Sequence, residues 1–287
     1  MKNIEINMSD IGFGANRLGI KHGYVMIKDR KPALYEKINY VPYDLLPEDM
    51  TLTNKKFYNT VYEASVNIYN ASLKSFAAGK LPLTLGGDHS LALGSIKASM
   101  KANEGEDIGL IWIDAHADIN TFEISDSGNI HGMPVSGLLG INDEKYNNLG
   151  NDLRIKPENM AYVATRDVDY NEEILINKYG ILNYSDSMIE ATSFDACLEA
   201  IVNHLKGKVK KVHISLDLDS INPKFIKGVS TPVVGGLTLD EPLRLFKKIN
   251  ESFEIVGIDI VEYNPLTDVD EKTLNFVDEL ITDIEKI

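Results

Sequence analysis

Short apolar runs alternate with amphipathic segments along most of the 287-residue chain. The clearest run, residues 108–113, is apolar throughout, which is typical of a strand buried on both faces of a sheet. Similar runs predict further strands at residues 81–85, 160–165, 181–184, 212–218 and 255–261. Helical spacing of apolar side chains predicts helices at residues 54–78, 90–100, 171–178, 194–205, 240–249 and 272–287. The alternation predicts an α/β fold with three layers (α/β/α) around a mostly parallel central sheet.

Composition narrows the class of protein. No Pro/Gly/Ser-rich linker divides the sequence, so residues 1–287 are predicted to form a single domain. The net charge of −14 argues against a nucleic-acid surface, which requires clustered Lys and Arg. The single cysteine, Cys197, cannot form an internal disulfide and is expected to fill a helix core in a reducing compartment. The chain shows neither a signal peptide nor a run of the ~20 apolar residues that span a bilayer, so we expect a cytoplasmic protein with no membrane partner.

Side chains of the types that bind metal ions fall in three clusters, each directly after an apolar run. The clusters are Gly86-Gly87-Asp88-His89, Asp114-Ala115-His116-Ala117-Asp118 and Ser215-Leu216-Asp217-Leu218-Asp219. Ligands of parallel sheets bind outside the carboxyl ends of the strands, so we expect these clusters to meet at one edge. Four close carboxylates require a counter-charge, and one catalytic metal usually takes about three protein ligands. The candidates His89, Asp114, His116, Asp118, Asp217 and Asp219 therefore predict two metal ions that share carboxylates and activate a water.

Ligand chemistry favours manganese. Carboxylates with imidazoles and no thiolate suit Mn²⁺, although Fe²⁺, Co²⁺ and Zn²⁺ also accept such ligands. On an extended strand Asp114 and Asp118 would lie ~13 Å apart, too far for one metal with bonds of ~2 Å. Either the chain bends after Asp114, or the two residues bind different ions. His213 lies equally far from Asp217 along its strand, and we interpret it as a core histidine.

The three motifs together are similar to those of the ureohydrolase family, and within it of the arginases, in the family's order and spacing over nearly the whole chain. Two further segments favour the arginase branch: residues 127–136 (Ser-Gly-Asn-Ile-His-Gly-Met-Pro-Val-Ser) and residues 231–238 (Thr-Pro-Val-Val-Gly-Gly-Leu-Thr). The resemblance implies hydrolysis of L-arginine to L-ornithine and urea by attack of a metal-bridging hydroxide on the guanidinium carbon. It also implies two Mn²⁺ per subunit, or Co²⁺ or Fe²⁺ in their place, and a homotrimer or homohexamer.

The resemblance also implies a role for each site residue. One Mn²⁺ would be held by His89 and Asp118 and the other by His116 and Asp219, with Asp114 and Asp217 bridging the pair. Asp118 would also hydrogen-bond the hydroxide, His131 would shuttle protons, and Glu262 would orient the guanidinium. The α-carboxylate and α-amino groups would be recognised by polar side chains, with Thr231 lining the same pocket. Asn120, Ser125 and Ser127 would face the carboxylate, and Asp169 and Glu172 the ammonium.

Three alternatives stay open. Another ureohydrolase, such as agmatinase, guanidinobutyrase or formiminoglutamase, would keep the metal centre and change the substrate. A metal-dependent amide deacetylase of related fold would use one zinc and fewer ligands. A non-enzymatic metal-binding or scaffold protein would be favoured by a missing ligand, but all six are present.

Overall fold

The computed structural model describes residues 2–17, 19–46 and 55–287. Eight strands form one sheet in the order β2-β1-β3-β8-β7-β4-β5-β6, and every neighbouring pair is parallel. Their bounds are β1 (Ile4–Met8), β2 (Ile38–Tyr40), β3 (Leu81–Leu85), β4 (Ile108–Ile113), β5 (Met160–Val163), β6 (Leu182–Tyr184), β7 (Lys211–Asp217) and β8 (Glu254–Val261). The α/β fold with a parallel central sheet is confirmed.

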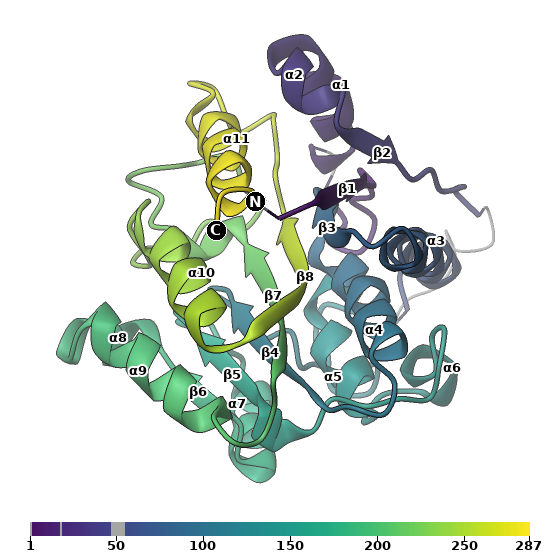
Figure 1. Ribbon diagram of the computed structural model, residues 1–287. Coiled ribbons are helices and arrows are strands. Elements are labelled where there is room, and N and C mark those ends of the chain that lie inside the picture. The colour runs from purple at the N-terminus through teal and green to yellow at the C-terminus, as the bar shows by residue number, and fades with distance from the viewer. Residues whose placement is uncertain (1, 18, 47–54) are drawn as a thin grey trace.

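Helices cover both faces of the sheet (Figure 1). One face packs against α9 (Phe194–Leu205), α10 (Glu241–Ser252) and α11 (Lys272–Ile284), and the other against α3 (Tyr58–Ala77), α4 (Ala92–Ala102), α5 (Pro134–Leu139) and α7 (Tyr170–Tyr179). Strand β4 shows why its sequence is apolar throughout, because its alternate side chains enter opposite hydrophobic clusters. Ile111 belongs to the first and Trp112 to the second.

The clearest sequence patterns predicted element bounds to the residue. Strands β3 and β4 and helix α9 begin and end where expected, and Cys197 is buried in α9. The long helix expected from Asn54 is observed as Tyr58–Ala77, and Asn54 itself lies outside the described residues. His213 is a buried core residue, as interpreted.

Several short elements were not predicted. These are strands β1 and β2, with α1 (Gly23–Arg30), α2 (Pro32–Tyr35), α5, α6 (Glu144–Asn147) and α8 (Asp186–Ala191). None of the described helices is long and apolar enough to cross a membrane.

Strand order places the site. The four adjacent strands β3, β8, β7 and β4 end side by side, since Leu85 pairs with Ile260, and Leu216 pairs with both Ile260 and Ile113. Each predicted metal cluster begins within four residues of one of these ends. The sheet therefore delivers all three clusters to one edge, as parallel sheets do.

Candidate active site

Backbone bends bring the clusters together. Asp118 has a φ of 50°, and Glu262, directly after β8, has a φ of 67°. Left-handed backbone at residues other than glycine costs about 1–3 kcal/mol and persists where the surrounding structure holds it in place. The bend at Asp118 resolves the distance problem posed by the sequence, because Asp114 and Asp118 both reach the same imidazole.

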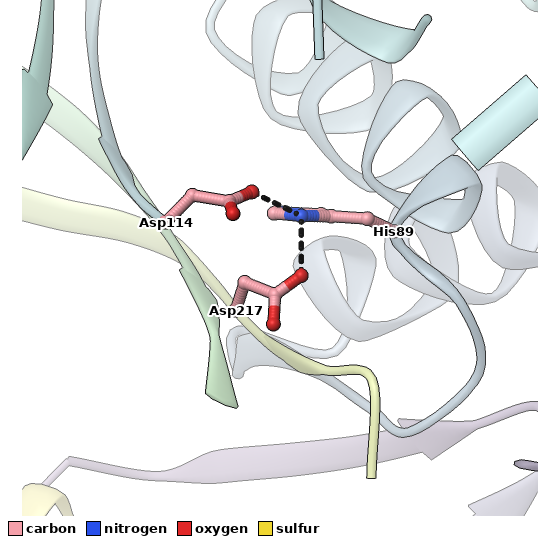
Figure 2. A group of neighbouring side chains, drawn as sticks. All are labelled: His89, Asp114 and Asp217. Carbon is pink, nitrogen blue, oxygen red and sulfur yellow. Dashed lines mark ion pairs between the residues drawn. The ribbon is translucent and has the colours of Figure 1, made fainter. Parts of the chain in front are cut away.

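His89 stands at the centre of the first ligand group. Its Nδ1 lies 2.9 Å from Asp114 Oδ2, 3.2 Å from Asp118 Oδ2 and 3.2 Å from Asp217 Oδ2. Figure 2 shows the imidazole of His89 pointing between the carboxylates of Asp114 and Asp217. All four side chains are buried, so the group is shielded from bulk water.

His116 forms the second group. Its Nδ1 lies 3.1 Å from Asp219 Oδ2 and 3.4 Å from Asp114 Oδ1. The two oxygens of Asp114 therefore face different imidazoles, and Asp114 belongs to both candidate metal-binding groups. Asp217 Oδ2 lies beside His89, and Asp217 Oδ1 accepts the backbone N–H of Asp219 in the second group.

Electrostatics show that the cluster requires positive charge. Burial alone would lower the pKa of His89, but its close ion-pair contacts with Asp114, Asp118 and Asp217 raise that pKa well above the ordinary value. Burial and the Asp114 charge raise the pKa of Asp118 to about 6. Burial and neighbouring carboxylates also raise the pKa of Asp217 and of Asp219. Protons therefore compensate the charge when no cation is bound, and divalent cations would displace them.

The donor set fits two divalent cations. Each candidate group has one imidazole nitrogen and at least two carboxylates, with ligand atoms within 4.8 Å of one another. The buried Nδ1 of His89 has no hydrogen-bond partner of its own among the described residues apart from these ion-pair contacts. A cation bound between the carboxylates and this nitrogen would satisfy both.

Two supporting residues carried no predicted role. Trp112 stacks on the His89 ring with centroids 4.0 Å apart, and its Nε1 donates to Asp114 Oδ2 over 3.0 Å. Ser215 Oγ lies 2.9 Å from His89 Nε2. Each lies two residues before a predicted ligand on its strand, Trp112 before Asp114 and Ser215 before Asp217. Period-two spacing puts such pairs on one face, so this signal was present in the sequence.

A buried polar pair lies near this centre and joins His213 of β7 to Asp259 of the adjacent strand β8. His213 Nε2 lies 2.9 Å from Asp259 Oδ2, and His213 Nδ1 lies 2.9 Å from Ser99 Oγ. Burial would raise the pKa of Asp259, but the adjacent imidazole and the hydroxyls of Ser95 and Ser215 lower it. The core histidine is thus a satisfied hydrogen-bonding residue close to the candidate centre.

A cavity of about 170 Å³ opens beside His116 and Asp118. All the residues predicted to recognise substrate line it, together with His131: Asn120, Ser125, Ser127, Asp169, Glu172 and Thr231. Its described lining contains four carboxylates and no Lys or Arg, which favours a cationic ligand. Thr231 Oγ1 donates to Asp219 Oδ2 over 2.9 Å, which ties this wall to the second group.

His131 and Glu262 form a pair at the cavity. His131 Nδ1 lies 3.1 Å from Glu262 Oε1, which also accepts the backbone N–H of His89. Burial would lower the pKa of His131, but the hydrogen bond and charge of Glu262 raise it to about 9. Glu262 Oε2 is buried and has no partner among the described residues. Glu262 is only 1% exposed, and its link to the cavity is through His131, which lines it.

The two acidic residues expected at the ammonium end differ in exposure. Asp169 is exposed and accepts from Asn120 Nδ2 over 3.1 Å. Glu172 is buried, and its two oxygens accept the backbone N–H groups of Ile119 and Asp169. Burial and the charge of Asp118 raise the pKa of Glu172 to about 8. Asp169 is therefore the freer counter-ion of the pair.

Comparisons with known proteins agree with this geometry. The family model described as "Arginase family" matches residues 15–284. An arginase of Brevibacillus brevis is 34% identical over 280 residues, which is 93% of each chain. A crystal structure of Entamoeba histolytica arginase in complex with L-ornithine has a TM-score of 0.90 at 27% identity and covers all of both chains. An arginase structure from Bacillus subtilis has a TM-score of 0.89 at 31% identity, covering 99% of this chain and 98% of that one.

Proposed function

We propose, since the chain belongs to the arginase family, that it is an enzyme hydrolysing L-arginine to L-ornithine and urea with two Mn²⁺ per subunit. One observation carries the proposal. Asp114 faces both His89 and His116 through different oxygens, and His116 and Asp118 of this centre line a cavity with four carboxylates and no Lys or Arg in its described lining. A centre built to share one carboxylate between two cations, beside a cavity for a cationic ligand, suits guanidinium hydrolysis.

The residues that would hold the ions follow from the two groups. His89 and Asp118 would bind one ion and His116 and Asp219 the other, and both ions would share Asp114 and Asp217. When bound, the two cations supply Lewis acidity and lower the pKa of a shared water. Two dications balance the charge of the four carboxylates, and the absence of thiolate among the ligands favours manganese over softer metals.

The protein's own groups would orient the guanidinium and move protons. Glu262 Oε2, buried without a partner among the described residues, is an acceptor for a guanidinium N–H. His131, held at Nδ1 by Glu262, has its Nε2 available to carry protons between the reacting nitrogen and solvent. Its partly exposed position at the cavity suits that exchange, since a proton shuttle must reach both ends.

Recognition of the amino-acid end would use the cavity wall. Asn120, Ser125 and Ser127 would hydrogen-bond the α-carboxylate, and Asp169, supported by Glu172, would bind the α-ammonium. A site built to bond a polar group rejects analogues that lack it. We therefore propose L-arginine rather than agmatine as the substrate. We also propose that the subunit is a single cytoplasmic domain and that it assembles as a homotrimer or homohexamer.

The test is urea release from L-arginine and from agmatine by protein stripped of metal and reloaded with Mn²⁺. The proposal expects urea from L-arginine and little from agmatine. Asp118→Asn serves as the inactive control, so that activity from a contaminant is recognised. Urea from agmatine alone would keep the metal centre and refute the assignment of Asn120, Ser125 and Ser127. No urea from either, or a stoichiometry of one metal, would favour formiminoglutamase or a deacetylase.

A further inference from the structure

One loop carries both serines of the cavity wall. Residues 121–127 join Asn120 to Gly128, and their hydrogen bonds are largely local. Gly128 N–H donates to Ser125 Oγ over 3.0 Å, and Asn129 N–H donates to Ser127 Oγ over 3.2 Å. Such contacts shape the loop but do not fix its position relative to the sheet. Position must come from contacts with the rest of the protein.

Phe122 supplies those contacts. Its ring packs edge-on against Tyr58 of α3 and Tyr146 of α6, with centroids 5.3 Å apart in each case. Both tyrosines are buried. The backbone N–H of Phe122 donates to Asn142 Oδ1 over 3.2 Å. Edge-to-face aromatic pairs contribute about 0.5–1.5 kcal/mol each beyond their burial. Two such pairs are therefore a substantial anchor for a loop of seven residues.

A lysine covers the same ring. Lys55 Nζ lies 4.6 Å from the Phe122 centroid and forms an ion pair with Asp143 Oδ2 over 2.5 Å. Asp143 caps α6 by accepting the Tyr146 N–H. A cation over an aromatic face is attracted by the ring. The partly buried ring of Phe122 is therefore held by two aromatic contacts and one cation.

The amide that binds Phe122 also holds the start of the loop. Asn142 Nδ2 donates to Ser136 Oγ over 2.8 Å, and Ser136 Oγ donates to the Asn120 carbonyl over 2.7 Å. Asn142 thus holds Phe122 directly and Asn120 through Ser136. The aromatic anchor and this amide together set where Ser125 and Ser127 stand in the cavity.

We propose that Phe122 is a specificity-positioning residue, which holds the 121–127 loop so that its serines meet the α-carboxylate of the substrate. The inference rests on the proposed function. Preorganised polar groups bind a ligand without the entropy loss of ordering a loop. Loss of the ring should therefore weaken ligands that carry an α-carboxylate. The metal ligands and the His131–Glu262 pair lie outside the loop and should keep their function.

The experiment compares Phe122→Ala, Phe122→Leu and the control Tyr62→Leu in the Mn²⁺-loaded protein. Tyr62 stacks on the other side of the same cluster, against Tyr58 at 5.9 Å, and no described contact joins it to the loop. For Phe122→Ala we expect the KM for L-arginine to rise about tenfold while kcat stays within about twofold. Phe122→Leu should recover most of the change, and Tyr62→Leu should lower the melting temperature without changing KM.

Calorimetry provides a second readout that does not depend on turnover. L-Ornithine should bind Phe122→Ala about tenfold more weakly, and 1,4-diaminobutane, which lacks the carboxylate, should bind as it does to the unsubstituted protein. Equal loss for both ligands, loss of metal, or no change in either would overturn the proposal. If Phe122→Ala does not fold, Asn142→Ser removes the acceptor of the Phe122 N–H and should give the same selective loss. Absence of urea from the unsubstituted enzyme would instead refute the proposed function.

Discussion

Ser215→Ala tests whether the serine beside His89 sets the affinity of the metal centre. For Nδ1 of His89 to bind a cation, the proton of the ring must lie on Nε2, and Ser215 Oγ is the acceptor 2.9 Å from it. Both side chains are fully buried. Water cannot replace the lost hydroxyl without entering a sealed site.

The magnitude follows from that burial. A buried donor left without its acceptor costs about 1–3 kcal/mol. Loss of such a partner behind a ligand typically weakens metal binding by roughly 10–100-fold. At about 1.4 kcal/mol per tenfold change, the two ranges agree. We expect a weakening of this size for the ion held by His89, and a smaller effect on the ion held by His116.

The assay is calorimetric titration of metal-free protein with Mn²⁺, supported by the metal content retained after dialysis. Ser99→Ala is the matched control, because Ser99 is also fully buried and its hydroxyl contacts an imidazole, that of His213, at the same 2.9 Å. It should leave the Mn²⁺ affinity unchanged. Equal Mn²⁺ affinities for Ser215→Ala and Ser99→Ala would refute the reasoning, because the Ser215 hydroxyl would then have no specific effect on the metal centre.

Two further predictions concern His131 and Lys97. His131→Asn should slow turnover by roughly 10²–10⁴-fold with both metals still bound, which kcat and metal analysis will check; loss of metal would make His131 a ligand. Burial, with the charge of Arg154, lowers the pKa of Lys97 from 10.5 to about 7. Between pH 7 and pH 10.5 the unfolded chain therefore binds more protons at Lys97 than the folded chain does. Lys97 should make the unfolding free energy rise with pH in this range, by up to roughly 1.4 kcal/mol per pH unit. Urea unfolding at pH 7, 8 and 9 should show a smaller rise of the unfolding free energy with pH in Lys97→Met. An unchanged rise would contradict the lowered pKa of Lys97.

The sequence was most informative where a single physical rule dominates. Residues 108–113 are buried on both faces, so their composition alone predicts the strand. The parallel sheet predicted that the three clusters share one edge, but their contact depends on the adjacency of β3, β8, β7 and β4, which the sequence did not reveal. The bend at Asp118 was left open, because the left-handed backbone there is imposed by surrounding contacts rather than by the residue itself.

Other features depended on distant neighbours. Phe122 has no local pattern, and its partners Tyr58 and Tyr146 come from separate helices. Spacing along one strand places Trp112 and Ser215 on the same face as Asp114 and Asp217, but their contacts with His89 depend on how separate segments pack, which that spacing does not supply. Strands β1 and β2 were missed because their short sequences mix polar with apolar residues, whereas the equally short β3 is a nearly continuous apolar run.

The position of β8 has a consequence for how the protein is made. Although β8 is the last strand in sequence, it lies between β3 and β7 in the middle of the sheet. It carries Glu262 to His89, 173 residues away. During synthesis β3 and β7 therefore leave the ribosome with facing edges unpaired, and such edges are templates for pairing with other chains. The active site and the protection of these edges arise in one step, when β8 inserts, so the nascent chain remains prone to aggregation until that step occurs.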